Sequence, residues 1–297
     1  MFTLNSDRLS VEIMEPGEGT NRGFRFDRAG YISEVVLDGD MRFAATEPRN
    51  LAHPSSLGRG FCNEYRFDPS GEAAIGDYFP KFGIGIIQKE DEGKFVFHKA
   101  YRNFRENAVA ITKSKDAARF ITEPMPCLGY AVRLTKEIRV SGNTMSMDVT
   151  VENVGEKPIT MNEFCHNFIS IDGMAVGSDY ELDLPQCPDL GHERLNNRRG
   201  FSGVLRGNGR GLTFCEFTAI DTDYAVQGAD MEQTVPFTWT LRHKGARGMV
   251  AGRDYFIPKF IAVWAVDHIV SPEVVHEFTV EPGAAHSWKR EWTFDTF

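Results

Sequence analysis

The segment Thr144-Met145-Ser146-Met147-Asp148-Val149-Thr150-Val151 alternates strictly between polar and apolar side chains. Successive side chains of a β-strand point to opposite faces of its sheet. The pattern therefore predicts a strand with its methionine and valine side chains on one face and its polar side chains on the other. No stretch of comparable length carries the 3.6-residue apolar stripe typical of a helix, so this segment sets the fold class.

Segments of similar character lie on both sides of it. The expected strands are residues 31–37, 94–98, 130–140, 159–171, 237–243, 259–270 and 286–294. Turn sequences such as Asp38-Gly39 and Pro282-Gly283 separate them, because glycine supplies the positive φ that tight turns require. The stretch closest to a helix, Arg49–Leu57, is interrupted by Pro54. We therefore expect an all-β protein, a large antiparallel two-sheet sandwich in which residues 1–297 form a single domain.

Composition excludes several classes of function. Of 297 residues, 41% are hydrophobic and 25% charged, which is typical of a globular protein. The 33 Lys and Arg are outnumbered by 42 Asp and Glu, and a net charge of −9 argues against nucleic acid or an anionic membrane as the main partner. No apolar run approaches the roughly 18 residues of a membrane span, and no signal peptide is visible, so we expect a cytoplasmic protein.

The cysteines and histidines do not predict a metal or disulfide framework. Five cysteines are widely spaced without a C-x-x-C pair, which predicts reduced thiols. Nitrogen and oxygen ligands for a metal are present, but nothing in their spacing fixes a site. They are His98, His166, His243, His268 and Glu273. We expect neither a metal nor a cofactor.

The densest polar cluster within an apolar strand is Asn162-Glu163-Phe164-Cys165-His166-Asn167-Phe168. Alternation places Asn162, Phe164, His166, Phe168 and Ser170 on one face and Glu163, Cys165 and Asn167 on the other. A histidine between two phenylalanines is either a core histidine bonded to a backbone carbonyl or an acid/base catalyst. Cys165 and His166 do not form a catalytic dyad, because neighbouring strand residues point to opposite faces.

Three further candidates have equally plain structural readings. His98 ends the expected strand 94–98 and is either a surface histidine or a ligand-binding one. Glu273 follows a long apolar strand, so it is either a solvated strand-end acid or a carboxylate facing a cleft. Arg59 lies between Gly58 and Gly60, which allow close approach of a backbone, or it is a simple turn arginine.

An arginine-rich stretch runs from Asp189 to Gly211. Its arginines are Arg194, Arg198, Arg199, Arg206 and Arg210. The stretch is either a solvated excursion between strands or a basic lip that attracts an anionic substrate. Gly207-Asn208-Gly209-Arg210-Gly211 lacks the strand–loop–helix context of a phosphate-binding loop.

Two longer pieces of sequence, together with Arg59, carry a resemblance to a known family. Residues 151–159 (VENVGEKPI), followed by 163–168 (EFCHNF), form a strand, an Asn-x-Gly turn and a strand with a histidine cluster. Residues 278–288 (FTVEPGAAHSW) place a Pro-Gly turn between the last strands. In these features the chain resembles the aldose 1-epimerases of the galactose mutarotase-like superfamily, as a divergent member. The resemblance implies a β-supersandwich with a sugar-binding cleft on one concave sheet.

The resemblance also implies a chemistry for particular residues. In the family a glutamate base takes the proton of the anomeric hydroxyl, while a histidine acid protonates the ring oxygen. Carried over, His166 becomes the acid and Glu273 the base, with Glu277 as a rival base. Arg59 and His98 would bind the substrate. For the family's substrate-binding aspartate the candidates are Asp267 and Asp230.

Where the family has the sequence His-Pro-Tyr-Phe, this chain has His166-Asn167-Phe168-Ile169. The difference points to a divergent subgroup acting on an unassigned sugar. A sugar-phosphate or uronate-acting epimerase or lyase of the same fold is an alternative. A second alternative is a non-catalytic carbohydrate-binding sandwich, with Trp239 and Trp264 either as sugar platforms or as core residues. The expected partner in every case is a monosaccharide or sugar derivative.

Overall fold

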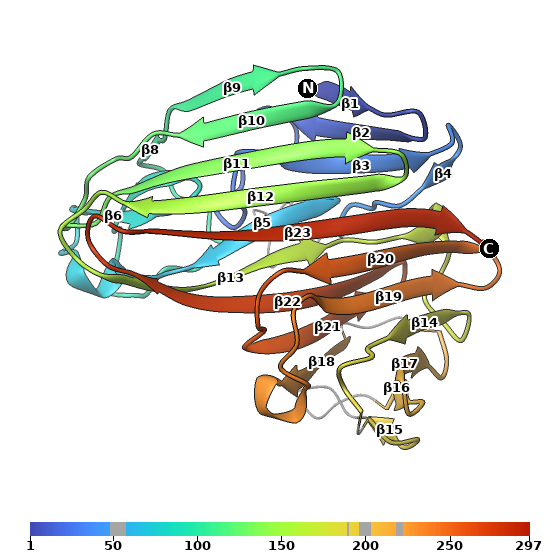
Figure 1. Ribbon diagram of the computed structural model, residues 1–297. Helices are drawn as coiled ribbons and strands as arrows, with labels where there is room; N and C mark the ends of the chain where they lie inside the picture. Colours follow the sequence, from blue (N-terminus) through green and yellow to red (C-terminus); the bar gives the residue numbers. More distant parts are fainter. Residues whose placement is uncertain (48–57, 189, 196–202, 218–221) are drawn as a thin grey trace.

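The computed structural model describes all residues except 48–57, 189, 196–202 and 218–221. The predicted all-β fold is confirmed: antiparallel strands form two large sheets and one small one. The stretch Arg49–Leu57 lies outside the described residues. In Figure 1 the two large sheets lie one behind the other.

The first large sheet has nine strands within the described part of the chain. In spatial order they are β1 (Phe2–Asn5), β2 (Leu9–Met14), β3 (Tyr31–Leu37), β5 (Phe61–Arg66), β13 (Ile159–Asn167), β22 (Ile269–Val280), β21 (Phe260–Val266) and β18 (Thr222–Gln227), with β4 (Met41–Arg42) paired to β3.

The second large sheet has eleven described strands. In spatial order they are β15 (Arg194–Leu195), β16 (Leu205–Gly207), β17 (Gly211–Phe214), β14 (Tyr180–Asp183), β19 (Phe237–His243), β20 (Gly248–Asp254), β23 (Ala285–Thr296), β12 (Thr144–Asn153), β11 (Val132–Ser141), β10 (Ala117–Thr122) and β9 (Val109–Lys113).

The small sheet and three short 3₁₀ turns complete the fold. The sheet contains β6 (Tyr78–Lys81), β7 (Gly85–Gln88) and β8 (Phe104–Glu106), and the turns are Ser70–Glu72, Ile171–Gly173 and Gly228–Asp230. No helix in the described residues is long and apolar enough to cross a membrane.

Most of the expected strands are confirmed, and one is wrong. Strands β3 and β19 have the predicted bounds, and β12 extends the alternating segment to Asn153. Residues 94–98 form no strand: they lead into a turn, and the hydrogen bond from Lys99 N to Val96 O closes it. A short run rich in β-formers does not become a strand without a partner for its backbone, because strand stability comes from pairing and packing.

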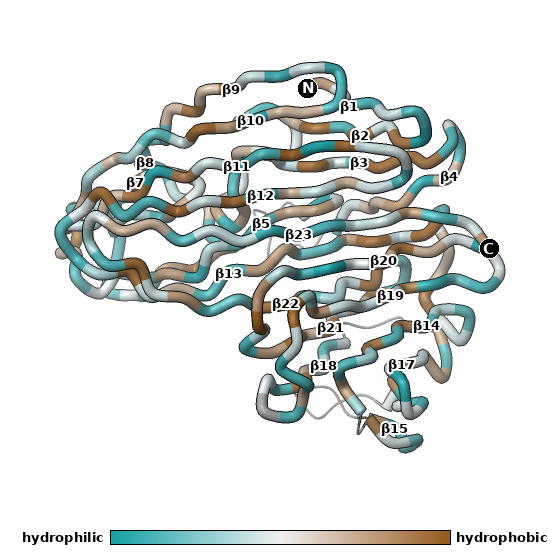
Figure 2. Tube along the Cα trace, viewed as in Figure 1, coloured by the Kyte–Doolittle hydropathy of each residue, from teal (hydrophilic) through white to brown (hydrophobic). Residues whose placement is uncertain are grey.

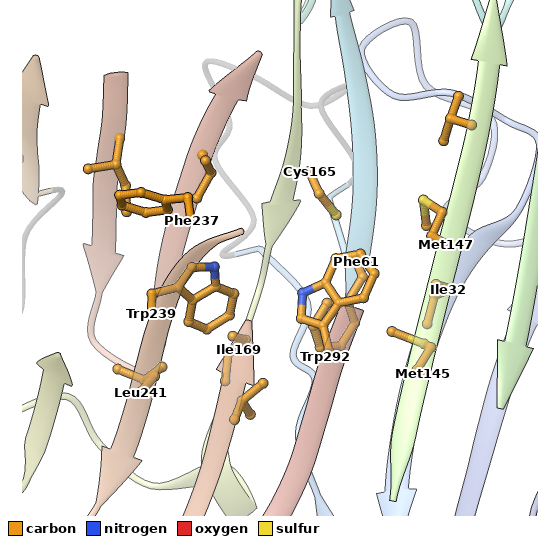
Figure 3. Packing of buried hydrophobic residues seen from close by; sticks show 14 of the residues in the cluster. Ile32, Phe61, Met145, Met147, Cys165, Ile169, Phe237, Trp239, Leu241 and Trp292 are labelled. Atoms are coloured by element: carbon orange, nitrogen blue, oxygen red, sulfur yellow. The ribbon is translucent and has the colours of Figure 1, made fainter. Parts of the chain in front are cut away.

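The core fills the space between the two large sheets. Met145 and Met147 of β12 face inward as predicted and are fully buried. Trp239 and Trp292 lie in the same layer and meet residues of the other sheet such as Phe61 (Figure 3). Trp239 is therefore a core residue, which was one of its two predicted readings. Hydrophobic and hydrophilic residues follow one another along many of the strands (Figure 2).

A buried polar network crosses the same core. Arg290 of β23 donates to Glu163 of β13 at 2.6 Å and also pairs with Asp254 of β20. Asn63 of β5 donates to the other oxygen of Glu163 at 2.7 Å and accepts from Lys136 of β11 at 2.7 Å. We refer to these five residues as the inter-sheet network. It joins the two large sheets by charge-assisted hydrogen bonds at their centre.

Candidate active site

The two faces of β13 have different surroundings, and the face assignment predicted from the alternation is confirmed. Glu163 points into the inter-sheet network, and Asn167 accepts a hydrogen bond from the indole of Trp292. Phe164 and His166 therefore lie on the opposite, outer face of the nine-stranded sheet. There the register pairs Phe164 with Glu64 and His166 with Cys62 of β5.

His166 and Glu273 meet on this outer face. The Nε2 atom of His166 lies 3.0 Å from Oε1 of Glu273 on the neighbouring strand β22, and both side chains are buried. On the other side of the imidazole, Nδ1 lies 2.9 Å from the Ser271 hydroxyl, which also accepts the backbone N–H of Asn167. A hydrogen bond between Nε2 and a carboxylate requires the proton on Nε2, so this arrangement presents an N–H acid next to a carboxylate base.

Aromatic rings surround the imidazole. Phe168 stacks on it with centroids 4.0 Å apart, and the indole of Trp264 meets it edge-on at 5.2 Å. Phe26, from the loop between β2 and β3, adds a further edge contact at 6.0 Å. Such rings exclude water and provide apolar surface of the kind that suits the C–H face of a sugar. Trp264, a predicted substrate-binding residue, therefore lies beside His166.

The surrounding charges keep Glu273 ionised. Burial alone would raise the pKa of Glu273, but the imidazole of His166 and the guanidinium groups of Arg25 and Arg66 outweigh it and lower this pKa below its ordinary value. Glu273 is therefore a carboxylate at neutral pH and is able to accept a proton.

Sequence reasoning missed a group of charged residues on the same face. Glu64 of β5 accepts hydrogen bonds from Arg25 at 2.8 Å and Arg66 at 3.0 Å. Burial opposes ionisation of Glu64, yet Arg25, Arg66 and Lys81 lower its pKa to about 2. We refer to Arg25, Glu64, Arg66 and Lys81 as the cation cluster. Alternation along Cys62–Arg66 could have placed Glu64 and Arg66 on one face, but the pairing of β5 with β13 cannot be read from either strand alone.

Arg59 lies at the rim of this face and is held by backbone and side-chain oxygens. Its Nε donates to Ser33 O at 2.9 Å and its Nη1 to the Thr46 hydroxyl at 3.2 Å. The flanking glycines allow the close approach that was predicted: a Cβ at Gly58 would lie 2.1 Å from the ring of Phe168, and Gly60 has φ +66° with Ile32 O at 2.2 Å from its would-be Cβ. A larger residue at position 58 would therefore displace a ring that stacks on His166.

The remaining candidates do not contact the His166–Glu273 pair. Asp267 lies in the turn between β21 and β22 and bonds to His268, whose other ring nitrogen lies 3.2 Å from Thr46 O. His98 lies in the turn that replaces the expected strand, next to Phe97, whose ring covers the guanidinium of Arg25. Of the two rival bases, Glu277 forms an ion pair with Lys259 on a more exposed part of β22.

Two other predicted features lie away from the pair. Asp230 lines a cavity of about 550 Å³ on the edge strand β18, together with Cys187, Tyr224 and Met231. In the arginine-rich stretch, Arg194 and Arg210 lie 3.5 Å from Glu216 and 3.6 Å from Asp183, whereas Arg198 and Arg199 lie outside the described residues.

Among the residues that the structure describes, no group of three or more His, Cys, Asp or Glu side chains is placed to hold a metal ion. The five described cysteines are all free thiols.

Comparison with known proteins identifies the fold. No family model and no curated protein matches the sequence. Solved structures do: a protein of Synechocystis sp. PCC 6803 (TM-score 0.62, 14% identity, covering 100% of this chain and 96% of that one) and a galactose mutarotase-like protein from Lactobacillus casei ATCC 334 (0.60, 13%, 99% and 100%). An aldose epimerase homologue from C. elegans is also similar (0.56, 10%, 99% and 98%). The chain has the galactose mutarotase-like fold.

This likeness confirms the predicted fold. It also confirms that the chain is a divergent one, because the sequence identity is low. At 10–14% identity it says nothing about individual side chains. Any chemistry inferred for this chain therefore rests on the side-chain contacts described above and not on the fold.

Proposed function

We propose that the protein is an aldose 1-epimerase-like isomerase, which interconverts the anomers of a sugar bound on the outer face of the nine-stranded sheet. The observation that carries the proposal is the contact between His166 Nε2 and Glu273 Oε1 at 3.0 Å, buried against Phe168 and Trp264. An acid and a base this close can act on two oxygens attached to the same carbon, which is what anomer exchange requires.

The proposed steps balance without a cofactor. Glu273 accepts the proton of the anomeric hydroxyl as the O–H electron pair forms the carbonyl at C1. The bond from C1 to the ring oxygen breaks, and the ring oxygen takes the Nε2 proton of His166. Rotation about the C1–C2 bond presents the other carbonyl face, and the reverse transfers close the ring and restore both residues. In this scheme the sugar replaces the direct His166–Glu273 hydrogen bond.

The site-directed test compares three variants by exchange NMR or polarimetry on a panel of aldoses. Loss of the acid in His166→Ala, or of the base in Glu273→Gln, is expected to lower kcat/KM about 10²–10⁴-fold, the usual contribution of general acid–base catalysis. Glu277→Gln tests the rival base, and we expect it to retain activity because that carboxylate is engaged by Lys259. Larger loss in Glu277→Gln than in Glu273→Gln would reassign the base.

Other results would reject the proposal. If neither neutral nor acidic sugars exchange anomers faster with the protein than without it, the protein is not a mutarotase. Sugar binding that survives both His166→Ala and Glu273→Gln without turnover would favour a carbohydrate-binding sandwich. An unsaturated product that absorbs in the ultraviolet would favour a lyase on an acidic sugar.

A further inference from the structure

The cation cluster lies close to His166 and Glu273 on the outer face of the nine-stranded sheet. Arg66 lies on the same face as His166, and its Nε bonds back along β5 to Glu64. Its guanidinium carbon lies 4.5 Å from the ring centroid of Phe164, and that ring lies 6.2 Å from the ring of His166. Phe164 therefore separates the cation cluster from His166 by a single side chain, so one small ligand is able to reach both.

The cluster contains more positive than negative charge. Arg25, Arg66 and Lys81 surround the carboxylate of Glu64. Further acids act on these cations: Glu47 lies 3.7 Å from Arg25, Glu273 interacts with Arg25 and Arg66, and Asp68 interacts with Lys81. Within the described residues, Arg66 makes its one hydrogen bond through Nε, so its two terminal nitrogens have no hydrogen-bond partner there, and its side chain is 46% exposed. The accessible end of the cluster is thus a guanidinium with two unused donors.

Lys81 is the least satisfied member of the cluster. It is 4% exposed, and its ammonium makes one hydrogen bond, to Tyr65 O at 2.6 Å, out of the three that it is able to donate. Its other neighbour is the ring of Phe95, with the centroid 5.3 Å from Nζ. No carboxylate among the described residues forms an ion pair with it. A buried ammonium without a paired anion is costly, and an arriving anion would relieve that cost.

We infer that the site takes a sugar that carries an anionic group, a carboxylate or a phosphate, and that Arg66 and Lys81 bind this group while His166 and Glu273 act on the anomeric centre. The inference rests on the proposed function for the reaction, but the anion site is carried by the cation cluster. Arginine presents parallel N–H groups that match either oxyanion, and lysine adds a point charge behind them.

Anion binding should depend on pH through Lys81. The pKa of Lys81 is lowered to about 8: burial is the largest cause, Arg66 and Arg25 act in the same direction, and Glu64 and Asp68 partly oppose them. As pH rises through about 8, Lys81 loses its proton and the site loses one of its two binding charges, so affinity should fall.

The first experiment measures anomer exchange on matched pairs of sugars. Glucose 6-phosphate against glucose tests the phosphate, and glucuronate against glucose tests the carboxylate. We expect at least one anionic sugar to exceed glucose in kcat/KM about tenfold or more, since a hydrogen bond to a charged group is typically worth that much. Arg66→Gln and Lys81→Met should lower this ratio, chiefly by raising KM for the anionic sugar.

The second experiment measures binding alone, by titration calorimetry with inorganic phosphate and with glucuronate between pH 7 and 9. Both variants should weaken binding about tenfold or more, and Lys81→Met should remove the decline above pH 8. Lys89→Met is the control for Lys81, because its ammonium also bonds a single carbonyl, Ala73 O at 2.9 Å. Arg133→Gln is the control for Arg66, since it is a similarly exposed arginine paired with Glu152 at 3.2 Å.

The possible results distinguish the anion site from the proposed mutarotase activity. Exchange of glucose at least as fast as of both anionic sugars would overturn the anionic substrate and leave the mutarotase intact. Absence of all exchange, with anion binding lost in Arg66→Gln and Lys81→Met but kept in the controls, would reject the mutarotase and support the anion site. Failure of wild-type protein to bind either anion would overturn the inference, and the half-exposed Arg66 keeps the test usable if Lys81→Met misfolds.

Discussion

Glu64 and Asp254 are both buried carboxylates paired with arginine, yet their pKa values are shifted in opposite directions. Burial raises the pKa of Asp254 to about 6, because its neighbour Arg290 is shared with Glu163. At Glu64 burial acts in the same sense, but three cations lower the pKa to about 2. Burial is common to the two sites, so the difference comes from the ratio of cations to carboxylates around each acid.

This comparison separates a structural charge cluster from a candidate binding one. In the inter-sheet network, each charge is matched by another within the core, and Trp239 adds a hydrogen bond to Asp254 at 3.2 Å. In the cation cluster, Lys81 has no ion pair with a described carboxylate and makes one hydrogen bond, and Arg66 is half-exposed. The first arrangement is complete without a ligand, whereas the second gains from one.

The largest expected effect is on stability and comes from breaking the inter-sheet network. Arg290→Met leaves Glu163 and Asp254 buried without their shared cation. Removing one partner of a buried ion pair typically costs about 3–5 kcal/mol in the free energy of unfolding. Equilibrium denaturation in urea, followed by tryptophan fluorescence, measures this loss.

The matched control is an arginine on the surface. Arg133→Met breaks a pair with Glu152 in which both side chains are about two-fifths exposed (40% and 41%), and such pairs are usually worth less than about 1 kcal/mol. Equal losses from Arg290→Met and Arg133→Met would contradict the distinction between the network and the surface.

A smaller effect concerns pH and Asp254. Because the pKa of Asp254 is about 6 in the folded protein, against an ordinary value near 4, the folded state holds a proton that the unfolded chain has released. Stability from this group is fully present below about pH 4 and is lost as pH rises through about 6. Asp254→Asn should flatten that part of the stability profile relative to the wild type.

The measurement is the midpoint of urea unfolding at pH 4, 5, 6 and 7 for both proteins, and only their difference is interpreted. We expect the stability of the wild type relative to Asp254→Asn to fall as pH rises from 4 to 7. A difference that is constant across this range would show that Asp254 is ionised at pH 4 and that Arg290 outweighs burial.

The smallest effect is on the outer face of β13. Ser271→Ala removes the hydroxyl that lies 2.9 Å from His166 Nδ1, so the imidazole loses one of the two contacts that fix its orientation and proton. One hydrogen bond is worth about 0.5–1.5 kcal/mol, which corresponds to roughly a two- to thirteenfold fall in kcat/KM for anomer exchange. Thr160→Ala, on the same strand pair, is the control, because Thr160 bonds only the exposed Thr279 hydroxyl at 2.8 Å. The assignment of Ser271 fails if both variants lose the same activity.

Much of the fold could be predicted because strand identity is a local property. Alternation at Met145 and Met147 indicated both the strand and its buried face, and the face of His166 followed from the same rule. The error at residues 94–98 has the complementary cause. Composition there favours a strand, but only a neighbouring backbone makes one, and the sequence does not say where that neighbour lies.

The site was predictable only in part, because it depends on which strands are adjacent. His166 and Glu273 were found by residue type and resemblance, and their 3.0 Å contact required β13 and β22 to be neighbours. Arg25 and Lys81 come from a loop and from the small sheet, far from both in sequence. No periodicity could bring them to Glu64, so the cation cluster was missed.

Strand β23 has a further consequence for how the protein is made. Although it covers Ala285–Thr296, it lies in the interior of the eleven-stranded sheet, between β20 and β12. During synthesis the ribosome releases β12 and β20 well before the strand that joins them. Until β23 emerges, both strands have an open edge that invites pairing with other chains, and Glu163 awaits the cation supplied by Arg290. The nascent chain is therefore most prone to aggregation before β23 is inserted, and a deletion of β23 should give insoluble protein.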